Sequence, residues 1–463
     1  GKDYPSPFDP LTSPLVSGGR MSSIAPALPR HHLLKILGVS FGVAVGVGDM
    51  LGSGILRAPN IMAATIPSVG VIIGLWLFGA FDAALGVNVF AELSTALPRS
   101  GGAYNYAQRA FGDIGGLIVG WANWLAFMAG IAAAAISFAN FLPLIWPWAG
   151  GHTVGVALAM SIALFGANML GLREGSVLQE STSFIKAVML IVFCVAAVLF
   201  TPQTAPLSPQ MAAPMLGWAT LVAGYQLVRG AYAGWDAPVY FTEETVDPAA
   251  AMPRALVVGL ALTTFLYVAV NAALLYALGL NGVASSPLPF TAVVSHFGPA
   301  ASVLFALTAM ITVASCANAN IMGGPRILYA MARDGLLPRI FETVNSGGSP
   351  TAAFLLTAVG SLAMTMSGAF VLVFGLIGTL NGLAAIVIVA ALFWLRRREP
   401  ELHRPFRAIF YPLLPGLWLV LQLALFALVA TTDRVGVLFA IGLSLACIPF
   451  ALIARHGRVR LPE

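Results

Sequence analysis

Two kinds of residue are scarce in this sequence: charged residues and cysteine. Asp, Glu, Lys and Arg make up 9% of the 463 residues, whereas hydrophobic residues make up 59%. No soluble domain of this length has such a composition, so the scarcity of charge indicates a protein that crosses a membrane many times. The formal net charge of +5 is no sign of a nucleic-acid partner, because the position of each charge matters more than the sum.

The three cysteines are Cys194, Cys316 and Cys447, and each lies inside a long apolar stretch. None lies in a loop between these stretches. We therefore expect no disulfide framework, and we interpret the cysteines as small apolar packing residues.

Motifs of catalytic and ATP-driven proteins are also missing. The sequence contains no Gly-x-x-x-x-Gly-Lys-Ser/Thr motif for phosphate binding. The apolar stretches contain no converging Ser/His set, paired aspartates or metal-ligand spacing. We therefore expect neither an enzyme nor an ATP-driven pump, and no metal or cofactor.

Twelve apolar stretches are long enough to span a bilayer, which takes about twenty residues per helix. The sequence thus predicts an all-α membrane protein with twelve transmembrane helices. The predicted spans are residues 34–66, 68–97, 112–145, 153–171, 176–200, 217–244, 253–280, 299–331, 350–368, 370–395, 408–431 and 434–455.

Basic residues gather in alternate loops. They follow the second, fourth, sixth, eighth and tenth spans, whereas the opposite loops at residues 201–214 and 281–286 carry no charge. Positively charged loops face the cytoplasm. We therefore expect both termini to be cytoplasmic and the protein to be a multi-pass protein of the cytoplasmic (inner) membrane.

The two ends of the chain differ from the spans in composition. Residues 1–33 are predicted to be a disordered cytoplasmic tail, because their first part is rich in Pro, Ser and Gly and lacks periodicity. Met21 is a plausible native start, so residues 1–20 could be foreign to the natural chain. Residues 456–463 are predicted to form a second cytoplasmic tail.

Glycines interrupt two of the spans. Gly52 and Gly54 weaken the first span, and residues 230–234 weaken the sixth, because glycine loses the most backbone entropy in a helix. Unwound backbone at membrane depth is tolerated only where it is buried or lines a cavity. Two such breaks at corresponding places in two halves are typical of a transporter substrate site.

Several motifs, in order along the chain, are similar to those of the amino acid–polyamine–organocation (APC) transporters. They are Gly52-Ser53-Gly54-Ile55, Pro98-Arg99-Ser100-Gly101-Gly102, Thr242-Glu243-Glu244 and Arg326-Ile327-Leu328-Tyr329-Ala330. Pro400-Glu401-Leu402-His403-Arg404-Pro405 resembles the light-chain L-amino-acid transporter branch. The resemblance implies a LeuT-like 5+5 inverted repeat, with repeats at residues 34–200 and 217–396 and two peripheral helices at 408–455.

The same branch joins a partner glycoprotein through an external cysteine. The loop after the third span, residues 146–152, has no cysteine. We therefore expect no disulfide-linked heavy chain and a stand-alone carrier of the prokaryotic type.

The two breaks supply the candidate substrate-binding groups. Backbone N–H groups of Ser53, Gly54 and Ile55, just after Gly52, would bind a carboxylate at the start of a half-helix. Close helix packing is the alternative role for these glycines. In the sixth span, free carbonyls of Gly230, Ala231 and Tyr232 would receive an α-ammonium, with Ala233 and Gly234 beside them and Trp235 as a wall.

Asn381, in the tenth span, corresponds to an asparagine near the substrate in the light-chain branch. The alternative role for Asn381 is an interhelical hydrogen bond.

One departure from the family bears on pocket size. Light-chain relatives usually have a bulky aromatic residue just before the Ala-Tyr pair of the sixth span, where this chain has Gly230. That aromatic is thought to close over bound substrate. Its absence implies a roomier pocket or a gate supplied elsewhere.

Lys186 lies deep in the fifth span, where an ammonium is costly and needs partners. Related sodium-independent carriers have a lysine here, where sodium-coupled members bind their second sodium. We expect this role for Lys186, with the carbonyls near Gly48 and the side chains of Ser315 and Asn318 as partners. The alternative is a lysine that snorkels to the interface.

Three aspartates also lie in the spans. Asp49 precedes the first break and could contact the substrate's ammonium or take up a proton. An ion pair with Lys186 is an equal alternative. Asp236 is predicted to cap the half-helix that follows the second break, and contact with a polar substrate side chain is the alternative. Asp82 has no role that the sequence assigns.

The function predicted from these observations is sodium-independent secondary transport of L-amino acids by alternating access, by exchange or proton coupling. Neutral side chains of small to medium size are favoured, because Ala233 stands where carriers of cationic substrates can have an acidic residue. The alternative within this class is a carrier of cationic amino acids or polyamines. A channel, or an amino-acid-sensing membrane receptor without flux, is the alternative of another class.

Overall fold

The computed structural model describes residues 33–200, 217–286, 288–368, 370–432 and 434–448. The two predicted tails, residues 1–33 and 456–463, lie outside this part of the chain except for residue 33. The uncharged loop at residues 201–214 also lies outside it.

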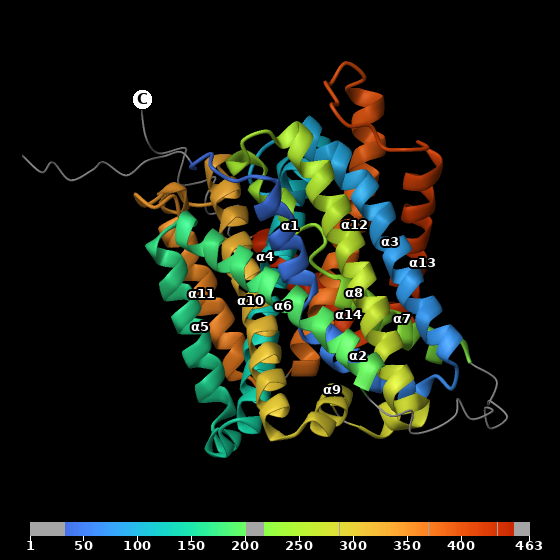
Figure 1. Cartoon of the computed structure of the whole chain (residues 1–463). Helices are drawn as coiled ribbons and strands as arrows, with labels where there is room; N and C mark the ends of the chain where they lie inside the picture. Colours follow the sequence, from blue (N-terminus) through green and yellow to red (C-terminus); the bar gives the residue numbers. More distant parts are fainter. Residues whose placement is uncertain (1–32, 201–216, 287, 369, 433, 449–463) are drawn as a thin grey trace, which may run out of the picture.

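The described residues form a helical bundle without a β-sheet (Figure 1). Eight helical segments are long and apolar enough to cross a membrane, and three shorter apolar helices accompany them. The helices are α1 (Val39–Met50), α2 (Ser53–Thr65), α3 (Val69–Ala96), α4 (Ala103–Phe141), α5 (Thr153–Leu170), α6 (Leu172–Phe200), α7 (Trp218–Tyr232), α8 (Pro248–Ser285), α9 (Pro289–Val294), α10 (Pro299–Arg333), α11 (Thr351–Met366), α12 (Phe370–Arg398), α13 (Leu413–Thr432) and α14 (Arg434–Leu445). Short 3₁₀ segments η1 to η5 connect some of them, and η3 covers Ala237–Glu244.

Large apolar side chains cover the outside of this bundle. Phe184 and Leu199 on α6, Phe265 on α8 and Val359 on α11 are all more than 60% exposed. Apolar surface of this extent is stable in the hydrocarbon of a bilayer and costly in water. The fold is therefore that of a multi-pass membrane protein.

The first predicted span is broken in the structure. Helix α1 ends at Met50, the chain passes through Leu51 and Gly52, and α2 begins at Ser53. The second half-helix packs very closely against α7, since a Cβ atom on Gly54 would lie 2.7 Å from the Cα atom of Ala231. Gly54 thus allows close packing, while the substrate role expected for its backbone N–H stays a prediction.

The sixth predicted span is broken as well. Helix α7 ends at Tyr232, and η3 begins at Ala237. Gly234, in between, has φ = 101°, a conformation that favours glycine. A side chain there would also collide with Asp49, whose Cγ atom lies 2.6 Å from an added Cβ. The two breaks therefore face each other across a glycine.

Long helices hold the two breaks in the interior. Helix α4 packs extensively against α10 and α12, while α1 and α2 pack against α8. Helices α5 and α11 lie at one side of the bundle, and α3 and α13 lie at the other (Figure 1). The side chain of Trp418 on α13 is buried, which shows that α13 packs against this bundle.

Ion pairs close one end of the bundle, which we call the arginine-rich end. Arg326 on α10 forms a buried pair with Glu244 at the end of η3, with an Nε–Oε1 distance of 2.6 Å. Arg333 pairs with Glu243 at 2.8 Å, and Arg99 pairs with Asp334 at 2.7 Å. These pairs tie the end of α10 to η3 and to the segment before α4.

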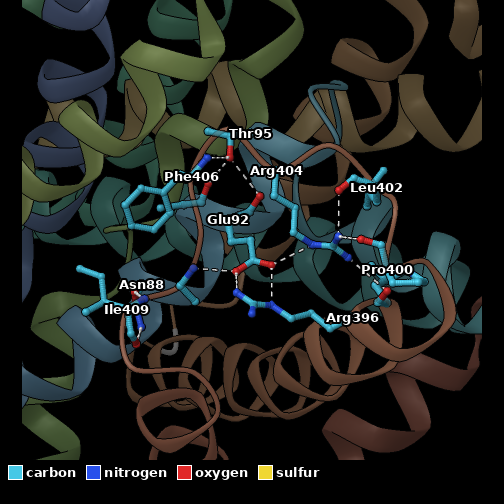
Figure 2. Close-up of polar contacts among 12 residues, drawn as sticks. Asn88, Glu92, Thr95, Arg396, Pro400, Leu402, Arg404, Phe406 and Ile409 are labelled. Atoms are coloured by element: carbon cyan, nitrogen blue, oxygen red, sulfur yellow. Dashed lines mark hydrogen bonds and ion pairs between the residues drawn. The ribbon is translucent and has the colours of Figure 1, made fainter.

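Glu92 on α3 organises a second cluster at this end (Figure 2). Its carboxylate accepts hydrogen bonds from Arg396 at 2.5 and 2.9 Å and from the backbone N–H of Ala408 at 2.6 Å, and forms an ion pair with Arg404 at 3.1 Å. Arg404 also donates to the carbonyl of Leu402 at 2.8 Å. The motif at residues 400–405 therefore positions the segment between α12 and α13 against α3.

Candidate substrate site

A cavity of about 80 Å³ lies where the two helix breaks meet. This space holds several water molecules or a small solute. Side chains of α4, α10 and α12 complete its wall, among them Phe127, Asn320 and Asn381. The cavity brings together eight of the predicted substrate residues: Asp49, Gly52, Ser53, Gly54, Gly230, Ala233, Gly234 and Asn381.

The start of α2 faces this cavity with its positive end. The first backbone N–H groups of a helix have no acceptor within the helix, and the helix dipole adds a partial positive charge there. Ser53 and Gly54 line the cavity, whereas the side chain of Ile55 is fully buried and lies outside the lining. An anionic group in the cavity would meet N–H donors at this point.

The end of α7 faces the same cavity with its carbonyl groups, some of which already accept hydrogen bonds. The carbonyl of Gly230 accepts from the N–H of Ala233 at 3.3 Å. The hydroxyl of Tyr267 on α8 lies 2.6 Å from the carbonyl of Ala231 and 2.5 Å from that of Met50. Tyr267 therefore ties the two breaks together, and it was missed in the sequence.

Two other residues of the sixth span lie beside the central cavity. Tyr232 and Trp235 line a neighbouring cavity and not the central one. The ring of Trp235 packs edge-on against Phe90, with a centroid distance of 5.0 Å, and against Trp418. Trp235 is thus a wall between α3 and the second break.

The carboxylate of Asp49 lies in the central cavity. It accepts hydrogen bonds from Asn320 and, at 3.5 Å, from the thiol of Cys316. Cys316 lines the cavity too, so its role goes beyond the apolar packing that the sequence predicts. Asp49 and Lys186, both within the described residues, do not form an ion pair.

Asp236 does not cap the segment after the second break, contrary to the prediction from sequence. Its side chain accepts no hydrogen bond from the N–H groups of η3. The carboxylate instead accepts from the hydroxyl of Tyr240 at 3.4 Å, and that hydroxyl accepts from Asn123 at 2.9 Å. Asp236 immediately precedes η3 and lines the cavity, so two acidic residues, Asp49 and Asp236, lie at this site.

Lys186 on α6 reaches the first break directly. Its ammonium donates to the carbonyls of Gly48 at 2.7 Å and Leu51 at 3.0 Å, and the side chain is fully buried. This geometry contradicts the alternative of a snorkelling lysine. The lysine joins α6 to the end of α1, where unwound backbone leaves carbonyls without helical partners.

The other predicted partners of Lys186 belong to an adjoining network centred on Gln179. Gln179 donates to Ser315 at 3.3 Å and to Ser183 at 3.2 Å, and it accepts from Asn318 at 2.8 Å. The hydroxyl of Ser183 also donates to the carbonyl of Ala44 at 2.8 Å. Gln179 was missed, although a glutamine in an apolar span was a usable signal.

Asp82, which the sequence left without a role, accepts three hydrogen bonds. Its donors are Tyr225 at 2.6 Å, Trp418 at 2.9 Å and Gln422 at 2.9 Å. The oxygen of Gln422 accepts in turn from Arg229 at 2.6 Å. A buried carboxylate with this many partners is stable at membrane depth.

Comparison with known proteins places these features in one family. A family model described as amino acid permease matches residues 37–446. The chain is 27% identical to the large neutral amino acids transporter small subunit 2 of Homo sapiens, over 81% of this chain and 72% of that protein. It is 28% identical to the Asc-type amino acid transporter 1 of Mus musculus, over 82% and 74%. It is 25% identical to the serine/threonine exchanger SteT of Bacillus subtilis (strain 168), over 90% and 96%.

Proposed function

The chain belongs to the amino acid permease family of the APC superfamily, and from this premise we propose that it is a sodium-independent secondary carrier of L-amino acids. The observation that supports the proposal best is the central cavity between the two helix breaks. A zwitterion fits there, with its carboxylate at the N–H groups of Ser53 and Gly54 and its ammonium towards the end of α7 and the carboxylates of Asp49 and Asp236.

Sodium independence rests on Lys186. Its ammonium supplies a fixed positive charge to the carbonyls of Gly48 and Leu51, where a sodium ion would otherwise be needed to neutralise them. Transport would then be driven by exchange or by proton coupling. Asp49 is the residue of the central cavity that we expect to take up a proton in the second case.

The proposed transport cycle is alternating access in a LeuT-like arrangement of two five-helix repeats, within twelve spans. The arginine-rich end would be cytoplasmic, because positively charged loops face that side. We place the protein in the cytoplasmic membrane as a stand-alone carrier, with the bilayer and its amino acid as partners. The described cysteines, Cys194, Cys316 and Cys447, are all unpaired.

Neutral side chains are our first proposal for the substrate, and cationic ones are the second. Asp49 and Asp236 in the central cavity favour a cationic substrate, since both are acidic and both line the space. The neighbouring cavity is lined by two basic residues, Arg57 and Arg229, and by two acidic ones, Asp82 and Asp236, so its wall offers no excess negative charge to a second positive group. A neutral amino acid satisfies both conditions, with its ammonium at the acidic side.

Uptake into proteoliposomes tests the proposal. A panel of radiolabelled amino acids would be measured with and without internal substrate and with imposed pH and sodium gradients. We expect saturable uptake that needs both the α-amino and the α-carboxylate group and that does not respond to sodium. Equal binding of the corresponding amines would contradict the site and favour polyamines. Binding without flux would indicate a sensor, and uptake that does not saturate would indicate a channel.

A further inference from the structure

We propose that the end of α12 and the segment after it form a binding site for an anionic phospholipid. The site lies at the arginine-rich end and combines exposed basic side chains with exposed apolar ones. We call it the lipid-facing surface, and it consists of Trp394, Arg397, Arg398, Arg407, Ile409 and Phe410.

Basic residues outnumber acidic ones in this segment. Residues 396–407 contain five arginines and two glutamates. Two of these arginines contact Glu92, and one of the glutamates pairs with Arg109 at 2.9 Å. Four exposed charged residues have no ion pair within the described part of the chain, namely Arg397, Arg398, Arg407 and Glu401. The surface therefore carries an excess of positive charge that an anionic partner would balance.

The carboxylate of Glu92 fixes two of these arginines near each other (Figure 2). Its Oε2 atom accepts hydrogen bonds from Arg396 at 2.5 Å and from the backbone N–H of Ala408 at 2.6 Å. Arg397 follows the first of these residues, and Arg407 precedes the second. The two exposed guanidiniums therefore extend from backbone that one carboxylate holds together. Guanidinium groups pair with phosphate in a favourable geometry, so one headgroup can bind both.

The segment after α12 runs along α3 from the arginine-rich end towards the membrane interior. Its backbone N–H groups contact α3 at successively deeper residues: Phe406 donates to Thr95 at 3.4 Å, Ala408 to Glu92 at 2.6 Å, and Ile409 to Asn88 at 2.8 Å. From the first to the last of these acceptors, α3 descends about 10 Å, at about 1.5 Å per residue. The order of basic and then apolar residues along this path matches the order of headgroup and acyl chain in a lipid.

Apolar side chains are exposed where the segment reaches this depth. Ile409 is 54% exposed and Phe410 is 73% exposed. Phe410 also has φ = 50°, a backbone conformation that is costly for a bulky residue. Because its ring is largely exposed, packing against the described residues does little to offset that cost. Contact with acyl chains would offset it.

Trp394 and Arg398 repeat this arrangement on α12. The guanidinium lies over the indole ring at 4.9 Å, and the ring is exposed one helical turn deeper than the arginine. Tryptophan is enriched at the boundary between headgroups and hydrocarbon. A free phosphate ion would use the arginines and leave the apolar side chains without a partner. The surface therefore favours a lipid with a negatively charged headgroup.

Lipid binding by the full-length protein, purified in detergent, tests the proposal. The protein would be titrated with phosphatidylglycerol, with phosphatidylcholine of the same acyl chains and with inorganic phosphate. Bound lipid would be counted by native mass spectrometry, and apparent dissociation constants would come from the rise in melting temperature, because a ligand of the folded state stabilises it.

Three variants separate this surface from charge in general. Arg397→Gln with Arg407→Gln removes two charges of the site. Arg254→Gln with Arg339→Gln is the matched control, since both arginines are exposed and lie outside the surface. Phe410→Asn keeps every charge and removes the ring, and asparagine tolerates a positive φ.

We expect phosphatidylglycerol to bind the natural protein and the control with equal affinity and to raise both melting temperatures. The double variant of Arg397 and Arg407 should bind it about tenfold more weakly or worse, because each arginine near an anionic headgroup contributes about fivefold. Phe410→Asn should also weaken binding, so the proposal can be tested even when the double variant fails to fold.

Four outcomes would overturn the proposal. Equal binding of phosphatidylcholine would show that the headgroup charge is not recognised. Equal weakening in the control would show that the basic residues act only through their number, as they do in setting membrane orientation. Unchanged binding in both site variants would place the lipid elsewhere. Stabilisation by inorganic phosphate through the same arginines would indicate a site for a free anion.

The measurement involves no substrate, so its result is independent of the proposed transport function.

Discussion

Replacing Lys186 with alanine should abolish transport, because this lysine supplies the only cation that contacts the unwound end of α1 among the described residues. Its ammonium binds the carbonyls of Gly48 and Leu51 at 2.7 and 3.0 Å. Hydrogen bonds to a charged group contribute about 1.5–3 kcal/mol each. The variant loses two of them and leaves two buried acceptors without a donor.

The net effect is smaller than the sum of the two bonds, since a buried ammonium carries a desolvation cost that the variant no longer bears. Each buried carbonyl that is left without a donor costs about 1–3 kcal/mol. A cost of about 3 kcal/mol in the transport-competent conformation lowers its population roughly a hundredfold, since each 1.4 kcal/mol is a factor of ten. Insertion should persist, because it depends on the summed hydrophobicity of the spans.

The assay is initial uptake of a radiolabelled amino acid by Lys186→Ala, normalised to folded protein, with and without sodium. Lys35→Ala, at an exposed lysine before α1, is the matched control and should transport normally. Sodium that occupies the vacated position would restore part of the activity. Uptake by Lys186→Ala at the natural rate would refute the proposed role of this lysine.

Three further changes have defined outcomes. Tyr267→Phe removes the hydroxyl that lies between the carbonyls of Met50 and Ala231, and it should lower the free energy of unfolding by about 1–3 kcal/mol. Thermal unfolding in detergent measures this effect. An unchanged melting temperature would contradict the link between the breaks. Glu244→Gln leaves the buried Arg326 without a carboxylate and should destabilise the closed arginine-rich end by about 3–5 kcal/mol. Single cysteines placed near that end should then react faster with a thiol label, because the end opens more often. Glu92→Ala removes the acceptor that holds residues 396–408 against α3 and should make the segment after α12 more sensitive to protease. Equal cleavage of the variant and the natural protein would show that contacts other than those of Glu92 hold this segment.

Some features of the site were predictable because they depend on the local sequence. The helix breaks follow from glycines in apolar spans, and the structure has them at Leu51–Gly52 and at residues 233–236. The contact of Lys186 with Gly48 was predictable from its depth in the fifth span and from the family resemblance. Both predictions need only the cost of unpaired polar groups in a membrane.

Other predictions failed where another polar side chain engaged the predicted residue instead of the expected partner. Asp236 has the residue type of a helix cap, but its carboxylate turns to Tyr240 and the central cavity. Ser315 and Asn318 have the residue types of lysine partners, but Gln179 engages them. Propensity identifies a polar residue that needs a partner, and it does not identify the partner.

The sequence by itself determined that this protein lies in a membrane, that two of its spans are interrupted and that its basic residues gather in alternate loops. Hydrophobicity, helix propensity and charge act along the chain, so a single sequence reports them directly. Only the tertiary structure decided that Tyr267 joins the two breaks, that Asp82 binds α13, and that the two breaks meet at one cavity. These features depend on which helix faces meet, and residues as far apart as Asp82 and Gln422 become neighbours only when the bundle has packed.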